Sequence, residues 1–362
     1  MAFTLRHLAT FPPTPSSLTT RLLRSVSTSS SPTGKHFSGR VMASVARKVL
    51  VPIANETEPM EAVITIDVLR RAGADVTVAS VEKQLPVDAF HGMKIVADAL
   101  ISDCASILSL FGGMPGTATL RDCKILETIV NKQAAGGRLY AATCEAPAVA
   151  LGSWGLLKGK NAVESRVHSD GKVLTTRGPG TAMEYSVALV EHLYGKDKAN
   201  EVSGPLLLVV SVSFCLLFYP GMRPNHGDEY TVHKLNPVEW KFDHCPKILV
   251  PVADGTEEME ATIIIDILRR AKADVVVASV GDKLEIVASR QVKLVADMLL
   301  EEAVKVSYDL IVLPGGLGGA QAFAKSENLV NLLKKQKEAN RAYGAICASP
   351  ALVLEPQGLL KG

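Results

Sequence analysis

KVLVPIANETEPMEAVITIDVLRRAGADVTVASV occupies residues 48–81, and KILVPVADGTEEMEATIIIDILRRAKADVVVASV repeats its pattern over residues 247–280. Each copy opens with a short apolar run, rich in Val and Ile, that suits a buried parallel strand. A polar turn follows, then apolar residues at helical spacing over 60–72 or 259–271, then a second apolar run. Because parallel strands joined by a helix need a right-handed crossover, the stretch predicts an α/β fold with a doubly wound sheet, present twice.

The repeat divides the 362 residues into one domain at 46–202, a linker at 203–246 and a second domain at 247–362. The first copy continues past its GLLKG segment for a further strand and helix, whereas the second copy stops at GLLKG. We therefore expect the second domain to be incomplete. The linker holds an apolar run at 206–219, shorter than the roughly 20 residues of a membrane helix. An alternative transcript or an erroneous gene model would account for both features.

The N-terminal segment at 1–45 is rich in Ser, Thr and Arg, and the first acidic residue of the chain is Glu56. This composition is typical of an organelle import signal, with an ordinary disordered tail as the alternative. We predict a transit peptide for the chloroplast. The mitochondrion, or the cytoplasm if translation starts at Met42, are the other locations that fit.

The composition indicates a globular protein, with 47% hydrophobic and 21% charged residues. A net charge of +2 argues against a nucleic-acid binder, because no domain-sized basic surface is implied. The six cysteines have neither CxxC spacing nor the density of a disulfide scaffold. We expect a reducing compartment and no metal or cofactor, with small molecules or another protein as partners.

Each copy later reaches a cysteine between an apolar strand and a helix, Cys144 in YAATCEAP and Cys347 in YGAICASP. Amide groups at a helix N-terminus favour a thiolate and can hold a developing oxyanion. Ser349 is a candidate cap for the helix after Cys347. The alternative is a small buried cysteine that packs as an apolar side chain.

Two further signals lie at the same predicted edge of the sheet. Gly315 and Gly316 end a strand, where their amides could line an anion site. Glu260, like Glu61 in the first copy, begins the first helix, where a carboxyl can share a proton with the thiol. Taken singly, the glycines suit an ordinary turn and the glutamates suit a solvated helix N-terminus.

Glutamate, glycine turn and elbow cysteine, in this order, resemble the DJ-1/PfpI family, which is glutamine amidotransferase-like, and especially its tandem plant members. EEMEATIIIDILRR, VLPGGLGGAQ and GAICASP carry the resemblance in the second copy, and TEPMEAVITIDVLRR and TTRGPGTAMEYSVALVE carry it in the first. The resemblance implies flavodoxin-like domains in a dimer or a tandem pseudo-dimer. It implies a redox-sensitive protein of the oxidative stress response, a cofactor-independent glyoxalase or deglycase for methylglyoxal-type compounds, or a non-catalytic chaperone-like protein.

The same resemblance assigns roles to single residues. Cys347 is the oxidisable cysteine and Glu260 the carboxyl that hydrogen-bonds it. The groups on the oxyanion side are Gly315, Gly316 and the Ala348 amide, with Arg290 as a basic residue near the pocket. The matching positions in the first copy are Cys144, Glu61, Gly112, Gly113 and Glu145, with His91 in place of Arg290.

The chain also departs from the family. Family members with glyoxalase activity use a histidine after the GLLKG-like segment, and neither copy supplies it, so we predict no complete Cys–His pair and little or no turnover. His168 is a poor substitute, because it sits beside a predicted turn. Glu145 next to Cys144 opposes thiol ionisation, so we expect Cys144 to have a higher pKa than Cys347. Expected partners are small reactive carbonyls or oxidants and a second copy of the chain, with no nucleic acid or membrane.

Overall fold

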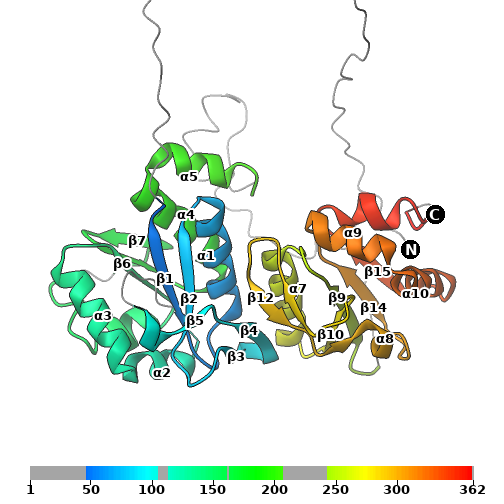
Figure 1. Ribbon diagram of the computed structural model, residues 1–362, viewed down its shortest axis with the longest axis horizontal. Coiled ribbons are helices and arrows are strands. Elements are labelled where there is room, and N and C mark those ends of the chain that lie inside the picture. The colour runs from blue at the N-terminus through cyan, green and yellow to red at the C-terminus, as the bar shows by residue number, and fades with distance from the viewer. Residues whose placement is uncertain (1–45, 105–112, 161–162, 207–242, 361–362) are drawn as a thin grey trace, which may run out of the picture. The chain divides into compact units, whose positions relative to one another are not determined.

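The computed structural model describes residues 46–104, 113–160, 163–206 and 243–360, and each repeat has its own layers of sheet and helix (Figure 1). The predicted import segment and most of the linker lie outside these ranges. Within the described part of the chain, no helix has both the length and the apolar character that crossing a membrane requires.

The first repeat alternates strands and helices, as its sequence predicts. Parallel strands β1 (Lys48–Ile53) and β2 (Asp75–Ser80) flank helix α1 (Pro59–Arg71) in sequence, and β2 also pairs with β5 (Ala99–Leu100). The other strands and α-helices described in this repeat are β3 (Pro86–Ala89), β4 (Met93–Val96), α2 (Gly116–Asp122), α3 (Lys124–Ala135), β6 (Tyr140–Thr143), β7 (Val167–Asp170), β8 (Val173–Thr176), α4 (Ala182–Tyr194) and α5 (Lys196–Ser203). Strand β8 lies between β6, which is parallel to it, and antiparallel β7.

The second repeat builds a five-stranded sheet in the order β13-β10-β9-β14-β15, with parallel neighbours throughout. This order has the reversal expected of a doubly wound sheet. The strands and α-helices of the second repeat are β9 (Lys247–Val252), α7 (Glu258–Arg270), β10 (Asp274–Ser279), β11 (Glu285–Val287), β12 (Lys293–Val295), β13 (Met298–Leu299), α8 (Leu300–Ala303), β14 (Leu310–Leu313), α9 (Leu317–Lys325), α10 (Glu327–Glu338) and β15 (Ala342–Ala345). The predicted α/β architecture is confirmed in both repeats.

The first helix of each repeat begins at a glutamate that caps it. Glu58 accepts a hydrogen bond from the amide of Met60, and Glu257 accepts one from the amide of Glu260 at 2.7 Å. These carboxylates satisfy amide groups that a helix N-terminus leaves without partners. In the second repeat, the cap also fixes the first turn of α7, where Glu260 lies.

A short sheet joins the two repeats. Strand β4 of the first repeat pairs antiparallel with β12 of the second, and Ile95 lies opposite Leu294 at the centre of the register. These two residues occupy matching positions in the repeat, so the pairing is symmetric. One apolar core includes residues of both repeats, among them Val63 of α1 and Ile265 of α7. The repeats therefore stabilise each other by burying a common apolar surface.

Candidate active site

Cys347 lies in a sharp turn directly after β15. Its backbone has φ 60°, a left-handed conformation that is uncommon for residues other than glycine. Such a turn after a strand projects the side chain from the edge of the sheet, as in a nucleophile elbow. The cysteine is exposed, so the alternative of a buried apolar cysteine is wrong for this copy.

The glycine turn and the predicted carboxyl meet at this thiol. Gly315 donates its amide hydrogen to Oε2 of Glu260 at 2.7 Å. A Cβ atom placed on Gly315 would lie 2.7 Å from that oxygen and 2.9 Å from Sγ of Cys347. Only glycine fits here, because any side chain would fill the space between the carboxyl and the sulfur.

The turn is held from both sides. Gly316 has φ 84°, and a Cβ atom there would overlap the Gly255 carbonyl and the Glu257 amide. Ser349 does not cap a helix as predicted: its hydroxyl donates to the carbonyl of Pro314 at 2.6 Å. The helix that follows, η6 (Pro350–Leu354), is a single π-helical turn. Ser349 therefore ties the elbow to the end of β14, and the helix contributes little dipole.

The first repeat reproduces the elbow but changes its surroundings. Cys144 has φ 56° and is half-buried, and Gly113 has φ 103° in the turn that matches Gly316. Glu61 is completely buried in the first turn of α1. Gly112, the predicted counterpart of Gly315, lies outside the described residues.

Glu145 is the main difference between the two elbows. Its Oε2 accepts a hydrogen bond from the amide of Gly113 at 3.1 Å, and the carboxylate also hydrogen-bonds the thiol of Cys144. Burial raises the pKa of Cys144 most, and the hydrogen bond to Glu145 and the charge of Glu61 raise it further. The effect of Glu145 has the predicted direction. The pKa of Glu145 is lowered, because its hydrogen bonds to Cys144 and Gly113 outweigh the opposing effect of burial. The thiol in the first repeat is therefore held protonated beside a carboxylate.

Cys144 also lines a cavity of about 470 Å³ between its elbow and the strands β7 and β8. His168 lies on β7 and lines the same cavity, together with Lys160 and Arg177. Within the described residues, no hydrogen bond joins His168 to Cys144. The imidazole thus shares the cavity with the thiol without being paired to it.

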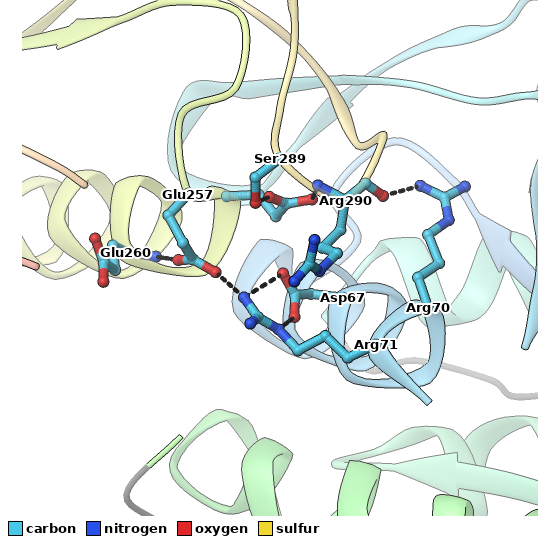
Figure 2. A network of polar contacts seen from close by, with 8 residues as sticks. Asp67, Arg70, Arg71, Glu257, Glu260, Ser289 and Arg290 are labelled. Atoms are coloured by element: carbon cyan, nitrogen blue, oxygen red, sulfur yellow. Dashed lines mark hydrogen bonds and ion pairs between the residues drawn. The ribbon is translucent and has the colours of Figure 1, made fainter. Parts of the chain in front are cut away.

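The predicted basic residues make contacts at the boundary between the repeats. The Arg290 amide donates to Glu258 and its carbonyl accepts a hydrogen bond from Arg70 (Figure 2). His91 contacts Asp266 through Nδ1 at 2.6 Å. In the described part of the chain, no hydrogen bond or ion pair joins Arg290 to Cys347 or Glu260.

Sequence reasoning missed the ion pairs that connect this boundary to the second site. Arg71 bonds Asp67 on its own helix and reaches Glu257 of the other repeat at 2.8 Å (Figure 2). Glu257 is also the cap that accepts the amide hydrogen of Glu260. Both copies have an Asp followed by an Arg four residues later on the first helix, and this spacing could have indicated the ion pairs.

Three buried carboxylates, Asp67, Glu257 and Glu258, offer oxygen atoms within 4.8 Å of one another. Arg71 binds the first two, and the third accepts hydrogen bonds from the Ser289 hydroxyl and the Arg290 amide. Protein donors already occupy these oxygens, so the cluster serves the contact between the repeats.

An α/β domain that presents a cysteine at a left-handed elbow, facing a carboxyl and a glycine turn, defines a thiol-site protein of the flavodoxin-like class. The chain belongs to the DJ-1/PfpI family, whose model matches residues 47–192 and 246–362. Both repeats are thus domains of this family.

The chain is similar to proteins from several organisms. It is 61% identical over 341 residues to protein DJ-1 homolog B of Arabidopsis thaliana, covering 89% of this chain and 75% of that protein. It is 55% identical over 342 residues to protein DJ-1 homolog A of Arabidopsis thaliana, covering 89% of this chain and 84% of that protein. The glutathione-independent glyoxalase DJR-1.2 of Caenorhabditis elegans is 30% identical over 180 residues, covering 44% of this chain and 95% of that protein.

Proposed function

We propose that the chain is a redox-sensitive protein of the oxidative stress response in which Cys347 is the oxidised residue. One observation carries the proposal: an exposed thiol lies at a left-handed elbow with Glu260 and Gly315 beside its sulfur. Exposure gives an oxidant access to the sulfur, and the carboxyl and amide groups supply hydrogen-bonding partners for added oxygen.

The reaction with hydrogen peroxide follows from this arrangement. The thiolate of Cys347 attacks one peroxide oxygen, an S–O bond forms as the O–O bond breaks, and the departing hydroxide takes a proton to become water. Sulfur loses two electrons and peroxide gains them, which gives a sulfenate. A second peroxide repeats the step and gives a sulfinate.

Mass spectrometry after mild peroxide treatment tests the proposal. We expect Cys347 to gain oxygen before any of the other five cysteines, and Cys347→Ser to abolish this early product. Cys245→Ser is the matched control, because Cys245 is also exposed but lies outside the site. Oxidation of Cys245 at the same rate as Cys347 would contradict the proposal.

A glyoxalase activity is the second candidate, favoured by the similarity to the glyoxalase of Caenorhabditis elegans. The sulfur of Cys347 would bond the aldehyde carbon of a 2-oxoaldehyde, and the carbonyl oxygen would take a proton, giving a thiohemiacetal. Lactate formation from methylglyoxal measures this activity, with Cys347→Ser as the control. We expect little or no lactate, because in the described part of the chain no hydrogen bond pairs Cys144 or Cys347 with a histidine. Turnover that depends on Cys347 would favour the glyoxalase, and a cellular role that survives Cys347→Ser would favour a chaperone-like protein.

A further inference from the structure

The two elbows share their backbone and differ in what lies on the glycine turn. A Cβ atom on Gly113 would overlap the Glu56 carbonyl and the Glu58 amide, which correspond to the groups that surround Gly316. Gly113 and Gly316 therefore have matching backbone surroundings. In the first repeat, the carboxylate of Glu145 accepts the Gly113 amide hydrogen at 3.1 Å. In the second, Ala348 occupies the matching position and has no side-chain acceptor.

We infer that the first repeat holds a second thiol site that Glu145 blocks with its own carboxylate. The Glu145 carboxylate accepts the Gly113 amide hydrogen. That hydrogen would otherwise be available to an oxygen added to the sulfur or to the oxyanion of a carbonyl adduct. The carboxylate also places a negative charge against the thiol, as the hydrogen bond between Glu145 and Cys144 shows. Residue 145 thus determines which of the two cysteines reacts.

Cys144 is half-buried, but a small molecule can reach it because it lines a cavity of about 470 Å³. The charged groups that face the thiol are the carboxylates of Glu61 and Glu145. On the cavity wall lie Lys160, which pairs with Asp170 at 3.0 Å, His168 and Arg177. The cavity can admit a small uncharged electrophile such as a peroxide or a 2-oxoaldehyde, whose oxygen becomes anionic on reaction.

The inference deepens the proposed function and rests on it, but its first test, thiol alkylation, needs no oxidant. Iodoacetamide alkylates thiolates, so its rate at each cysteine reports thiolate content and nucleophilicity. Peptide mass spectrometry of the full chain gives the rates of Cys144 and Cys347 in the same sample. A failed peroxide experiment at Cys347 would therefore leave this measurement interpretable.

Two variants separate the charge of Glu145 from its occupation of the turn. Glu145→Ala removes both, and we expect Cys144 to be alkylated at least about tenfold faster at pH 7.5, with a lower midpoint in its pH profile. Glu145→Gln removes the charge but keeps an acceptor for the Gly113 amide. We expect it to give most of the gain in alkylation but much less of the gain in sulfinate formation with hydrogen peroxide.

The reciprocal variant Ala348→Glu keeps the inference testable if the first repeat does not tolerate substitution. We expect it to slow alkylation of Cys347 about tenfold, while Cys144 in the same chain keeps its parent rate. Circular dichroism and the unfolding midpoint show whether each variant is folded. Unchanged alkylation of Cys144 in folded Glu145→Ala, or of Cys347 in folded Ala348→Glu, would overturn the inference.

Discussion

The two repeats build the same backbone and place different side chains on it. Their elbow cysteines have φ 56° and 60°, and each repeat sends an arginine from its first helix to a capping glutamate of the other. At the elbow, the first repeat has Glu145 where the second has Ala348. At the boundary, the first repeat has His91 and Pro59 at the positions where the second has Arg290 and Glu258. The duplicated fold therefore fixes where groups lie, and single side chains decide what each half does.

The boundary between the repeats shows this most clearly. The boundary has two halves, one around each arginine. In the first half, Asp67, Glu257 and Glu258 lie around Arg71, whose side chain is 19% exposed. The opposite half has Arg270, 38% exposed, between Asp266 and Glu58. The first half thus carries one more buried carboxylate, and its arginine is more enclosed.

Arg71→Ala should have the largest effect on stability. It removes the ion-pair partner of Asp67, which is fully buried, and a hydrogen-bond donor to Glu257, and a stranded buried charge is costly. We expect a loss of about 2 to 4 kcal/mol in the free energy of unfolding, measured by urea denaturation at pH 7.

Arg270→Ala is the matched variant in the other half. His91 still contacts Asp266 at 2.6 Å after the substitution, so we expect a smaller loss of about 1 to 2 kcal/mol. Lys198→Ala, which breaks an exposed pair with Glu201, should change stability by less than about 0.5 kcal/mol. Equal losses for Arg71→Ala and Arg270→Ala would show that the two halves carry the same energy despite their different carboxylates.

The sequence predicted the fold because its signals are local and long. The apolar runs at 48–53 and 247–252 and the helical spacing after them repeat in both copies, and they form β1, β9 and the helices α1 and α7. Strands β4 and β12 were not predicted. They have four and three residues, too few for a periodic pattern, and each pairs with a strand of the other repeat.

The candidate site was predictable to a similar degree. Cys347, Glu260 and Gly315 were expected at one edge of the sheet, because strand order brings these positions together. The effect of Glu145 on its neighbouring thiol also followed from adjacency in sequence. Its hydrogen bond to Gly113 did not, since the contact spans 32 positions and depends on how two turns approach each other. The role of Ser349 was misjudged because its hydroxyl reaches across to Pro314.

A smaller effect on stability should appear as a dependence on pH. The pKa of Glu257 is raised to about 8 by burial, by the charge of Asp67 and by the charges of Glu260 and Glu258. The hydrogen bond from the Glu260 amide lowers this pKa but does not cancel the rise. Burial and nearby carboxylates also raise the pKa values of Glu258 and Glu58. A carboxyl with a raised pKa in the folded state holds a proton that the unfolded chain releases. Its stabilising contribution is therefore complete below about pH 4.5 and is lost as the pH rises toward about 8.

Glu257→Gln tests this directly, because the amide keeps a similar shape and cannot titrate. The parent should lose free energy of unfolding between pH 5 and 8, by at most about 1.4 kcal/mol per pH unit for each proton involved. The variant should show a shallower decline. Only the slope is diagnostic, since the substitution also weakens the contact with Arg71 at every pH. Glu58→Gln is the control in the other half: Arg270 binds Glu58 at 2.5 Å and opposes the rise in its pKa, so this variant should flatten the slope less. A parent slope that survives unchanged in Glu257→Gln would assign the pH dependence to groups outside the boundary between the repeats.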